Sequence, residues 1–378
     1  MAGHQELAAT NISPFTDDIA GDHDEDAFAD RRGRGRLLAA CATAEDDGPQ
    51  GMEAIGDPAR AVPVAGETLV TTDPEVDADD PALWADARDP SRAVMFGTDK
   101  TDGLYVHNLD GSVRQFLPSG QLNNVDLRTG FQVNGREMVL VGATNDTPGG
   151  AGINFYLFDP DTLQTVDYGL VSIGMDEPYG FCMGRRGDEV YAVVTTKLGT
   201  THQWPVSAGP DGPVLGAERV LTLGSQLEGC VVDDAADTLY VGEEDVALWR
   251  YDFDPSGSGQ AVEIARVDYE RFKDDIEGVT LMRDGGEAFL IVSSQGDSTF
   301  PVYRIEGDEH VYLGRFAVVA AGDVDGVHGT DGLDAWSGPI GGFPNGLLAI
   351  HDDQEDSGPN QQNYKFVDWR EVRRALNF

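Results

Sequence analysis

Cysteines, long apolar runs and basic side chains are all scarce in this sequence of 378 residues. The three cysteines, Cys41, Cys182 and Cys230, form no paired Cys-x-x-Cys metal motif and no disulfide framework, and we interpret Cys182 and Cys230 as small buried hydrophobic residues. Because no apolar run reaches about 18 residues, no segment is expected to span a membrane. The 26 Lys and Arg residues against 67 Asp and Glu residues give a formal net charge of -41, which makes nucleic acid a poor partner.

Motifs for nucleophilic and zinc-dependent catalysis are missing as well. The sequence has no Gly-x-Ser-x-Gly elbow, no cysteine with a histidine nearby, and no thiolate or His-x-x-x-His set that would hold zinc. Residues 323–334 resemble a calcium-binding loop, but they lack the glutamate and the flanking helices of an EF-hand. These absences argue against thiol, serine and zinc chemistry.

Residues 1–63 differ in composition from the rest of the chain, because they are rich in Asp, Ala and Gly and show no strand alternation. Within them, residues 31–41 join a basic patch to Leu-Ala-Ala-Cys, which resembles an export signal or a lipid-attachment cysteine, although the apolar stretch is short. A disordered leader is the alternative. We expect the folded domain to span residues 64–378, and we expect a secreted, periplasmic or cell-surface protein.

The remainder of the chain repeats itself at intervals of roughly 50 residues. Six short apolar runs lead into polar loops, and an acidic or polar residue that opens another apolar strand precedes each of them, as in Glu228-Gly-Cys-Val-Val and Glu277-Gly-Val-Thr-Leu. Each repeat has room for four short strands. The sequence therefore predicts an all-β fold, a six-bladed β-propeller with four-stranded antiparallel blades. A pair of β-sandwiches would not explain the regular period.

Only two segments depart from this repeat. Residues 368–376 show the periodicity of a short helix. A strand around residues 62–70 is expected to close the ring with the C-terminal blade and so to leave few free sheet edges.

The polar residues at equivalent repeat positions are expected to meet on one face of the propeller. Those that open the first strand of a blade are Asp79, Asp80, Asn124, Asp126, Tyr179, Glu228, Glu277 and Asp331. The loops after the second strands add Lys100, Lys197, Glu243, Glu244 and Gln295, and Asp275 lies beside Glu277.

A single acidic residue in such a turn usually faces solvent, but acids at equivalent positions of several blades would repel one another. Oxygen ligands without histidine or cysteine predict Ca²⁺ or another hard cation. The fixed cations Lys100, Arg128 and Lys197 would suit a phosphorylated substrate. We therefore predict metal-assisted hydrolysis of a phosphate ester, in which a calcium-bound water attacks phosphorus.

With these residues in view, the chain resembles the β-propeller phytases, the alkaline calcium-dependent phytases of bacteria. The matching motifs lie in order over about residues 70–370 and include residues 77–84, 97–104, 122–128, 275–278 and 330–334. The resemblance implies an enzyme that removes phosphate stepwise from inositol hexakisphosphate (phytate), taken as its calcium complex. We expect a monomer.

The resemblance also implies a role for each site residue. Phosphate would be held by Lys100, Arg128, Tyr179 and Lys197. The active-site calcium ions would be ligated by Asp79, Glu228, Glu244, Asp275 and Glu277, with Glu243 and Gln295 alongside. Asp80, near Asn363, would belong to a structural calcium, and Asp331 and Asp334 to a further one.

The chain departs from the family pattern at Leu198 and Thr101, where family members often carry Glu and Lys. Both departures concern the pocket for the neighbouring phosphate. Two other functions stay open at this point. One is a six-bladed calcium-dependent lactonase or esterase, which would need a catalytic histidine. The other is a non-catalytic propeller that binds protein partners, which would need an apolar or aromatic top face.

Overall fold

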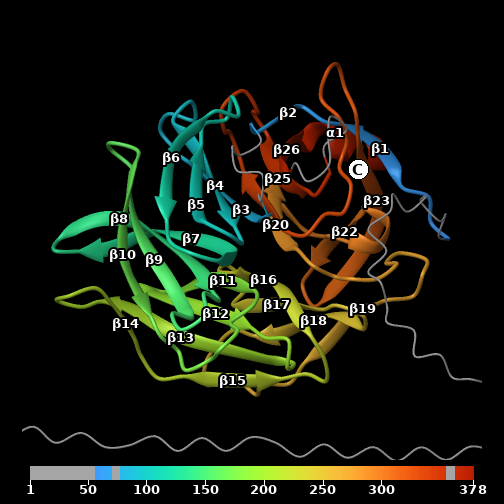
Figure 1. Cartoon of the computed structure of the whole chain (residues 1–378). Helices are drawn as coiled ribbons and strands as arrows, with labels where there is room; N and C mark the ends of the chain where they lie inside the picture. The colour runs from blue at the N-terminus through green and yellow to red at the C-terminus, as the bar shows by residue number, and fades with distance from the viewer. Residues whose placement is uncertain (1–55, 70–76, 355–361) are drawn as a thin grey trace, which may run out of the picture. The chain divides into compact units, whose positions relative to one another are not determined.

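The computed structural model describes residues 56–69, 77–354 and 362–378. Within these ranges the chain forms six sheets arranged in a ring, which confirms the six-bladed β-propeller (Figure 1). The expected leader falls mainly on residues 1–55, which lie outside the described residues. The exception is Arg60–Pro63, which forms strand β1.

Blades 1 and 2 each contain four antiparallel strands that follow the sequence outward from the centre of the ring. Blade 1 consists of β3 (Ala78–Ala85), β4 (Ala93–Asp99), β5 (Gly103–His107) and β6 (Val113–Pro118). Blade 2 consists of β7 (Leu122–Val133), β8 (Arg136–Asn145), β9 (Gly152–Asp159) and β10 (Gln164–Val171).

Blade 3 has a divided outer edge, and blade 4 again has four strands. Blade 3 consists of β11 (Phe181–Arg186), β12 (Glu189–Thr195), β13 (Thr200–Ala208), β14 (Pro213–Leu215) and β15 (Arg219–Thr222), and both β14 and β15 pair with β13. Blade 4 consists of β16 (Leu227–Asp233), β17 (Thr238–Glu243), β18 (Ala247–Asp252) and β19 (Val262–Arg266).

Blades 5 and 6 each take one strand from the N-terminal segment. Blade 5 consists of β20 (Val279–Asp284), β21 (Glu287–Val292), a 3₁₀ turn (Gln295–Asp297), β22 (Phe300–Glu306) and β23 (Glu309–Val319). Blade 6 consists of β24 (Leu333–Ser337), β25 (Gly346–Asp352) and β26 (Asn363–Asp368).

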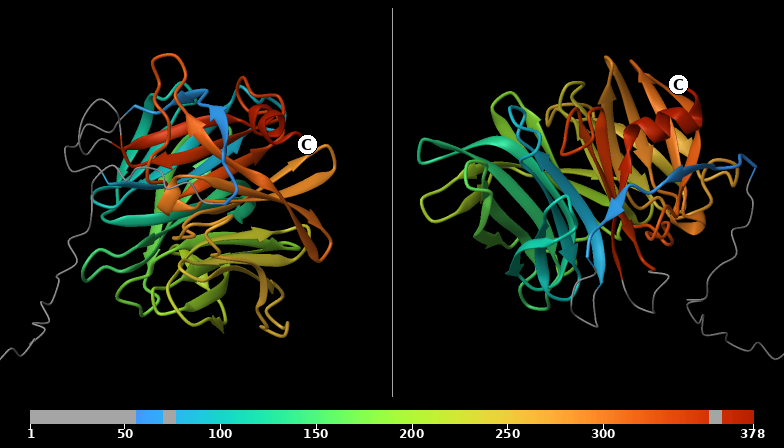
Figure 2. Two further views of the ribbon diagram at one scale, coloured as in Figure 1. Left: turned by 90° about the vertical axis from the view of Figure 1, so that its right-hand side faces the viewer. Right: turned by 90° about the horizontal axis from the view of Figure 1, so that it is seen from above.

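The ring is closed by residues from both ends of the described chain. Strand β2 (Gly66–Glu67) pairs antiparallel with β26 and becomes the outermost strand of blade 6, as the sequence predicts. Strand β1 runs parallel to β23 on the edge of blade 5, and Figure 2 shows it lying along that blade. Both pairings cover a sheet edge that would otherwise expose unpaired backbone groups.

The hydrophobic core is divided among the interfaces between neighbouring blades. One buried cluster, for example, joins Trp84 and Phe96 of blade 1 to Tyr156 and Phe158 of blade 2. The second strands, such as β4 and β25, are buried along their whole length because a blade packs on each of their faces. This double burial explains why their sequences are continuous apolar runs instead of alternating ones.

The chain ends in the short helix that the sequence predicts, α1 (Trp369–Leu376). Asp368 caps it by accepting a hydrogen bond from the backbone N–H of Arg370, and Trp369 and Val372 are fully buried against blades 5 and 6. Among the described residues, no helix is long and apolar enough to cross a membrane.

The interpretation of Cys182 and Cys230 as unpaired hydrophobic residues is wrong, because they form a disulfide between blades 3 and 4. They lie on the innermost strands β11 and β16, 48 residues apart, and their Cα atoms are separated by 5.6 Å. The separation is one residue short of the 49 that relates Tyr179-Gly180 to Glu228-Gly229, so the cysteines lie at neighbouring positions of adjacent inner strands, and this near match to the repeat was the signal that the sequence analysis missed. A disulfide is typical of proteins that reside outside the reducing cytosol.

We predict that replacing both cysteines by serine lowers the free energy of unfolding by about 2–4 kcal/mol, because the unfolded chain loses a covalent loop closure. Chemical denaturation of the wild type and the double variant, with thiol counting under denaturing conditions, measures this effect. Equal denaturation midpoints would show that the bond does not stabilise the ring.

Candidate metal and phosphate site

Glycines bring the first strands of successive blades into contact at the point where the predicted site residues begin. A Cβ atom on Gly229 would lie 1.9 Å from the carbonyl oxygen of Glu277, and one on Gly180 would lie 2.0 Å from that of Glu228. No other residue fits such an approach. The Glu-Gly and Tyr-Gly pairs of the repeat therefore place Tyr179, Glu228 and Glu277 next to one another.

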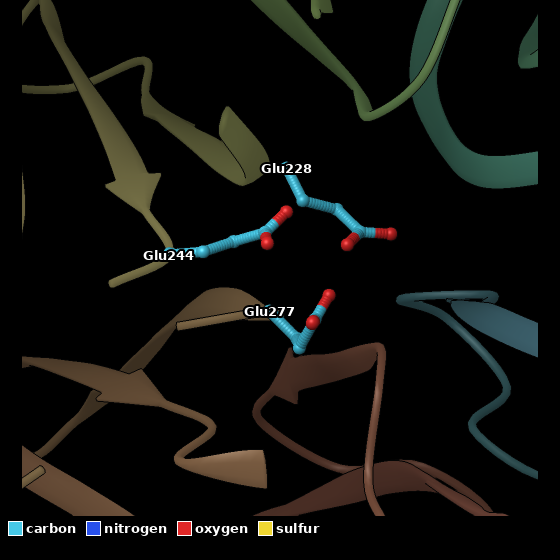
Figure 3. A group of neighbouring side chains, drawn as sticks. All are labelled: Glu228, Glu244 and Glu277. Atoms are coloured by element: carbon cyan, nitrogen blue, oxygen red, sulfur yellow. The ribbon is translucent and has the colours of Figure 1, made fainter. Parts of the chain in front are cut away.

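Three glutamates from two blades form the centre of the site. Glu228 lies on β16, Glu244 follows β17, and Glu277 precedes β20, and one carboxylate oxygen of each lies within 4.8 Å of the others. Figure 3 shows the three carboxylates directed toward a common space. All three residues are buried.

Burial and mutual repulsion disfavour the charged forms of these acids. Burial and the neighbouring Glu228 raise the pKa of Glu244 from 4.5 to about 8. Burial, again with Glu228, raises the pKa of Glu277 well above its usual range. A cation placed among these carboxylates would reverse the effect by favouring their ionised forms.

A second group adjoins the glutamates and contains the fixed cation of the site. Lys100 Nζ lies 3.3 Å from Asp79 Oδ1 and 3.3 Å from Asp331 Oδ2, and Gln295 donates a hydrogen bond to Asp331. Burial raises the pKa of Asp79 well above its ordinary value, and Glu228 and Asp331 add to this rise. For Asp331 burial acts in the same direction, but Lys100 and the other donors bring its pKa below the ordinary value.

The donor set fits a hard cation. Glu228 Oε2, Glu244 Oε1 and Asp79 Oδ2 are buried and have no hydrogen-bond partner in the described part of the chain. Buried oxygens without donors are costly unless something positive approaches them. Carboxylate oxygens alone, with no cysteine or histidine in the cluster, suit Ca²⁺ or Mg²⁺ better than zinc.

The second lysine lies at the rim of the same site. Lys197 Nζ is 4.5 Å from the centre of the Tyr179 ring and 2.6 Å from Glu177 Oε1, and its side chain is half-exposed. Leu198, which the family pattern would replace by Glu, is 88% exposed. This part of the site is therefore open to solvent.

Asp275 adopts a left-handed backbone conformation, with φ at 34°, that L-residues seldom adopt. Its carbonyl oxygen accepts a hydrogen bond from the backbone N–H of Gln295 at 3.0 Å. Burial and Asp245 raise the pKa of Asp275 to about 6. The strained turn is thus held by the blade that also carries Gln295.

The structure does not bring Arg128 to the glutamates and Lys100. It extends into the channel, where it pairs with Asp126 at 2.9 Å and with Asp234 at 3.1 Å and donates to the backbone carbonyl of Met183. Asp126 in turn accepts a hydrogen bond from the N–H of Met183 at 2.7 Å. The guanidinium group thus joins the inner strands of blades 2, 3 and 4.

Asp80 and Asp334 line the same channel, a cavity of about 170 Å³, together with Asn124, Asp126 and Arg128. Asp80 Oδ2 accepts the N–H of Val125 at 2.9 Å, and Asp334 Oδ2 accepts the N–H of Leu83 at 2.7 Å. Burial raises the pKa of both carboxyl groups, to about 6 for Asp334. The structure therefore separates Asp334 from Asp331.

Glu243 and Asn363 also lie outside the glutamate cluster. Glu243 Oε1 accepts hydrogen bonds from the Ser225 backbone and hydroxyl groups, and Oε2 accepts one from Trp249 Nε1 at 2.8 Å. Asn363 donates to Glu67 and to the carbonyl of Thr68, beside the closing strand β2. Glu243 orders a loop, and Asn363 borders a different hollow from the one that Asp80 lines.

Asp146 is a candidate site residue that the sequence analysis did not name. Burial and Glu177 raise its pKa, whereas Lys197 and Lys100 act to lower it, which places Asp146 among these three charges. It immediately follows β8, as Lys100 follows β4. The sequence repeat therefore pointed to Asp146, which lies one residue after Asn145, the last residue of the repeat element that we compared.

We predict that Gly229→Ala weakens metal binding at least tenfold and destabilises the protein, because the new Cβ must push Glu228 away from Glu277. Gly342→Ala is the matched control, since a Cβ there meets no atom within 4 Å. Terbium luminescence titration measures the affinity, and calorimetry measures the melting temperature. Equal terbium affinity in both variants would refute the role of this close approach.

Comparisons with known proteins agree with this geometry. The model of the family described as Phytase matches residues 50–377. The chain is 33% identical over 310 residues to the 3-phytase of Bacillus subtilis (strain 168), an alignment that covers 79% of this chain and 81% of that protein.

Solved structures add only weak likenesses. The crystal structure of a mitotic checkpoint complex aligns with a TM-score of 0.46 and 12% identity, over 88% of this chain and 98% of that one. A crystal structure of BBS1N in complex with ARL6DN aligns with a TM-score of 0.43 and 13% identity, over 77% of this chain and 78% of that one. Neither likeness carries an argument. The family match and the sequence identity do, and the chain is an enzyme that belongs to the phytase family.

Proposed function

We propose that the protein is a calcium-dependent phosphatase that removes phosphate groups one after another from phytate. The observation that carries the proposal is the buried cluster of Glu228, Glu244 and Glu277 beside the fixed cation Lys100. Its oxygen-only donor set favours calcium. Membership of the phytase family supports phytate as the substrate.

In this proposal the three glutamates, with Asp79 and Asp275, hold the active-site calcium ions. Bound calcium supplies positive charge for phosphate oxygens and makes a water molecule acidic enough to act as the nucleophile. The protein contributes ligands fixed on strand ends of several blades, so that little reorganisation is needed when charge develops at phosphorus.

Lys100 would bind the phosphate that is cleaved, since it is a fixed cation on which the charge of Glu228 acts. Tyr179 would donate a hydrogen bond from its hydroxyl group to a phosphate oxygen, because burial and the three glutamates keep its pKa far above the ordinary value and the phenol stays neutral. Lys197, at the open rim, would hold a neighbouring phosphate. Arg128 receives no phosphate role, because its N–H groups are engaged in the channel.

The exposed rim also suits the substrate. Phytate carries several phosphate groups, and a site that is open around Lys197 and Leu198 leaves room for those that are not being cleaved. We propose that the calcium complex of phytate is the species bound, because a net charge of -41 repels the free polyanion. We also propose secretion, with which the Cys182–Cys230 disulfide is consistent.

We predict that phosphate release from phytate requires calcium, ceases in excess chelator, and falls at least ~100-fold in Glu228→Gln, because a ligand is lost without a cavity. The metal-free variant should melt no lower than the wild type, since one repelling charge is gone. Asp161→Asn, at a side chain that is 85% exposed, is the matched control and should keep wild-type activity.

Two results would contradict the proposal. One is full phosphate release after exhaustive chelation. The other is wild-type turnover in Glu228→Gln. Ester or lactone cleavage without phosphate release would favour the lactonase alternative.

A further inference from the structure

A buried histidine stands directly behind the residues that hold Lys100. His351 lies on β25, the second strand of blade 6, and no part of it is exposed. Its ring packs edge-on against Tyr364 of β26, with 6.2 Å between the ring centres. It is not among the proposed metal or phosphate ligands.

His351 is hydrogen-bonded to two adjacent residues, Asp331 and Gly332. The backbone N–H of Asp331 donates a hydrogen bond to His351 Nδ1 at 3.2 Å, and the backbone N–H of His351 donates to the carbonyl of Gly332 at 3.0 Å. Because Nδ1 accepts, the ring proton resides on Nε2. The side chain therefore fixes the residue that opens the first strand of blade 6.

The orientation of Asp331 in turn determines the surroundings of Lys100. Asp331 Oδ2 lies 3.3 Å from Lys100 Nζ, and Gln295 donates to Oδ1 of the same carboxylate. If the backbone at Asp331 rotated, its carboxylate would leave Lys100, whose other ion-pair partner is Asp79. The contacts thus run in series from His351 to Asp331 to Lys100.

Packing alone does not explain a histidine at this position. His351 Nε2 is buried and has no hydrogen-bond partner among the described residues, which costs free energy that an apolar ring of similar size would avoid. The nitrogen that is satisfied is the one that accepts from Asp331. The imidazole thus carries the cost of a buried Nε2, while its other nitrogen, Nδ1, is the one that reaches the site.

We propose that His351 is a positioning residue that holds the Asp331 carboxylate against Lys100 through the Asp331 N–H···Nδ1 hydrogen bond. The expected effect on turnover rests on the proposed phosphate role of Lys100. The hydrogen bond between Asp331 and His351 does not depend on that role. His351 acts through Asp331 and does not touch the substrate.

The test compares two variants. His351→Phe fills the space without a hydrogen-bond acceptor. His351→Asn provides an acceptor, Oδ1, at the same number of bonds from Cα as Nδ1 of histidine. His107→Phe is the matched control, because His107 is also buried and packs on the ring of Tyr364 at 6.2 Å but does not contact Asp331 in the described structure. All variants are made in the full chain, and melting temperatures are recorded.

The first readout is acetylation of Lys100 by acetic anhydride in metal-free protein, measured by mass spectrometry relative to Lys273 in the same sample. Acylation needs the neutral amine, which the ion pair with Asp331 suppresses. We expect about tenfold faster labelling in His351→Phe, because the Lys100 ammonium group loses its contact with the Asp331 carboxylate. Labelling in His351→Asn and His107→Phe should match the wild type.

The second readout is phosphate release from calcium phytate, in which kcat/KM should fall in His351→Phe and recover in His351→Asn. Labelling in His351→Phe no faster than in His107→Phe would overturn the proposal. So would labelling in His351→Asn as fast as in His351→Phe. If His351→Phe does not fold, His351→Leu replaces it in the same comparison. A wild type without phytate turnover would refute the proposed function, and the labelling result would still decide the role of His351.

Discussion

Repulsion among buried carboxylates is the constraint on which this structure depends. The propeller brings acids from successive blades together at one end of its inner strands, where water cannot screen them. Glu244 titrates at about 8 because of burial and Glu228, so it is neutral in the metal-free protein below that pH. This raised pKa contributes stability that is complete below about pH 4.5 and is lost as the pH rises toward 8.

The same repulsion explains why the glycines and the ring closure matter to the structure. Close approach at Gly180 and Gly229 allows the strands to meet, but it also brings like charges together. Something must then hold the blades in place against the repulsion. The Cys182–Cys230 disulfide joins two of the inner strands, and β2 joins the N-terminal segment to the last blade. The fold therefore maintains an arrangement of charges that is unfavourable until a cation binds.

The sequence predicted the fold and the centre of the site because both follow from one repeat. An equivalent position in each blade lies at an equivalent height in the ring, so Glu228, Glu277 and Asp331 could be placed together. The spacing of the repeat also pointed to the Cys182–Cys230 pair and to Asp146, but we did not compare those positions.

The predicted residues that the structure does not bring to the glutamate cluster lie further along a strand or on its other face. Arg128 comes four residues after Asn124 on β7, which at about 3.3 Å per residue moves it ~13 Å down the channel. Asp334 is separated from Asp331 in the same way. Glu243 and Glu244 are neighbours whose side chains point in opposite directions, and the sequence alone does not say which of them faces the cluster.

Proton release on calcium binding tests the central claim most directly. Calcium is titrated calorimetrically into metal-free protein at pH 7 in two buffers that differ in ionisation enthalpy. Because Glu244 is protonated at that pH, binding must displace its proton, and the measured heat should depend on the buffer. At pH 9 the Glu244 carboxyl group is already ionised, and its contribution to the buffer dependence should disappear. Calcium binding at pH 7 with the same heat in both buffers would contradict the account.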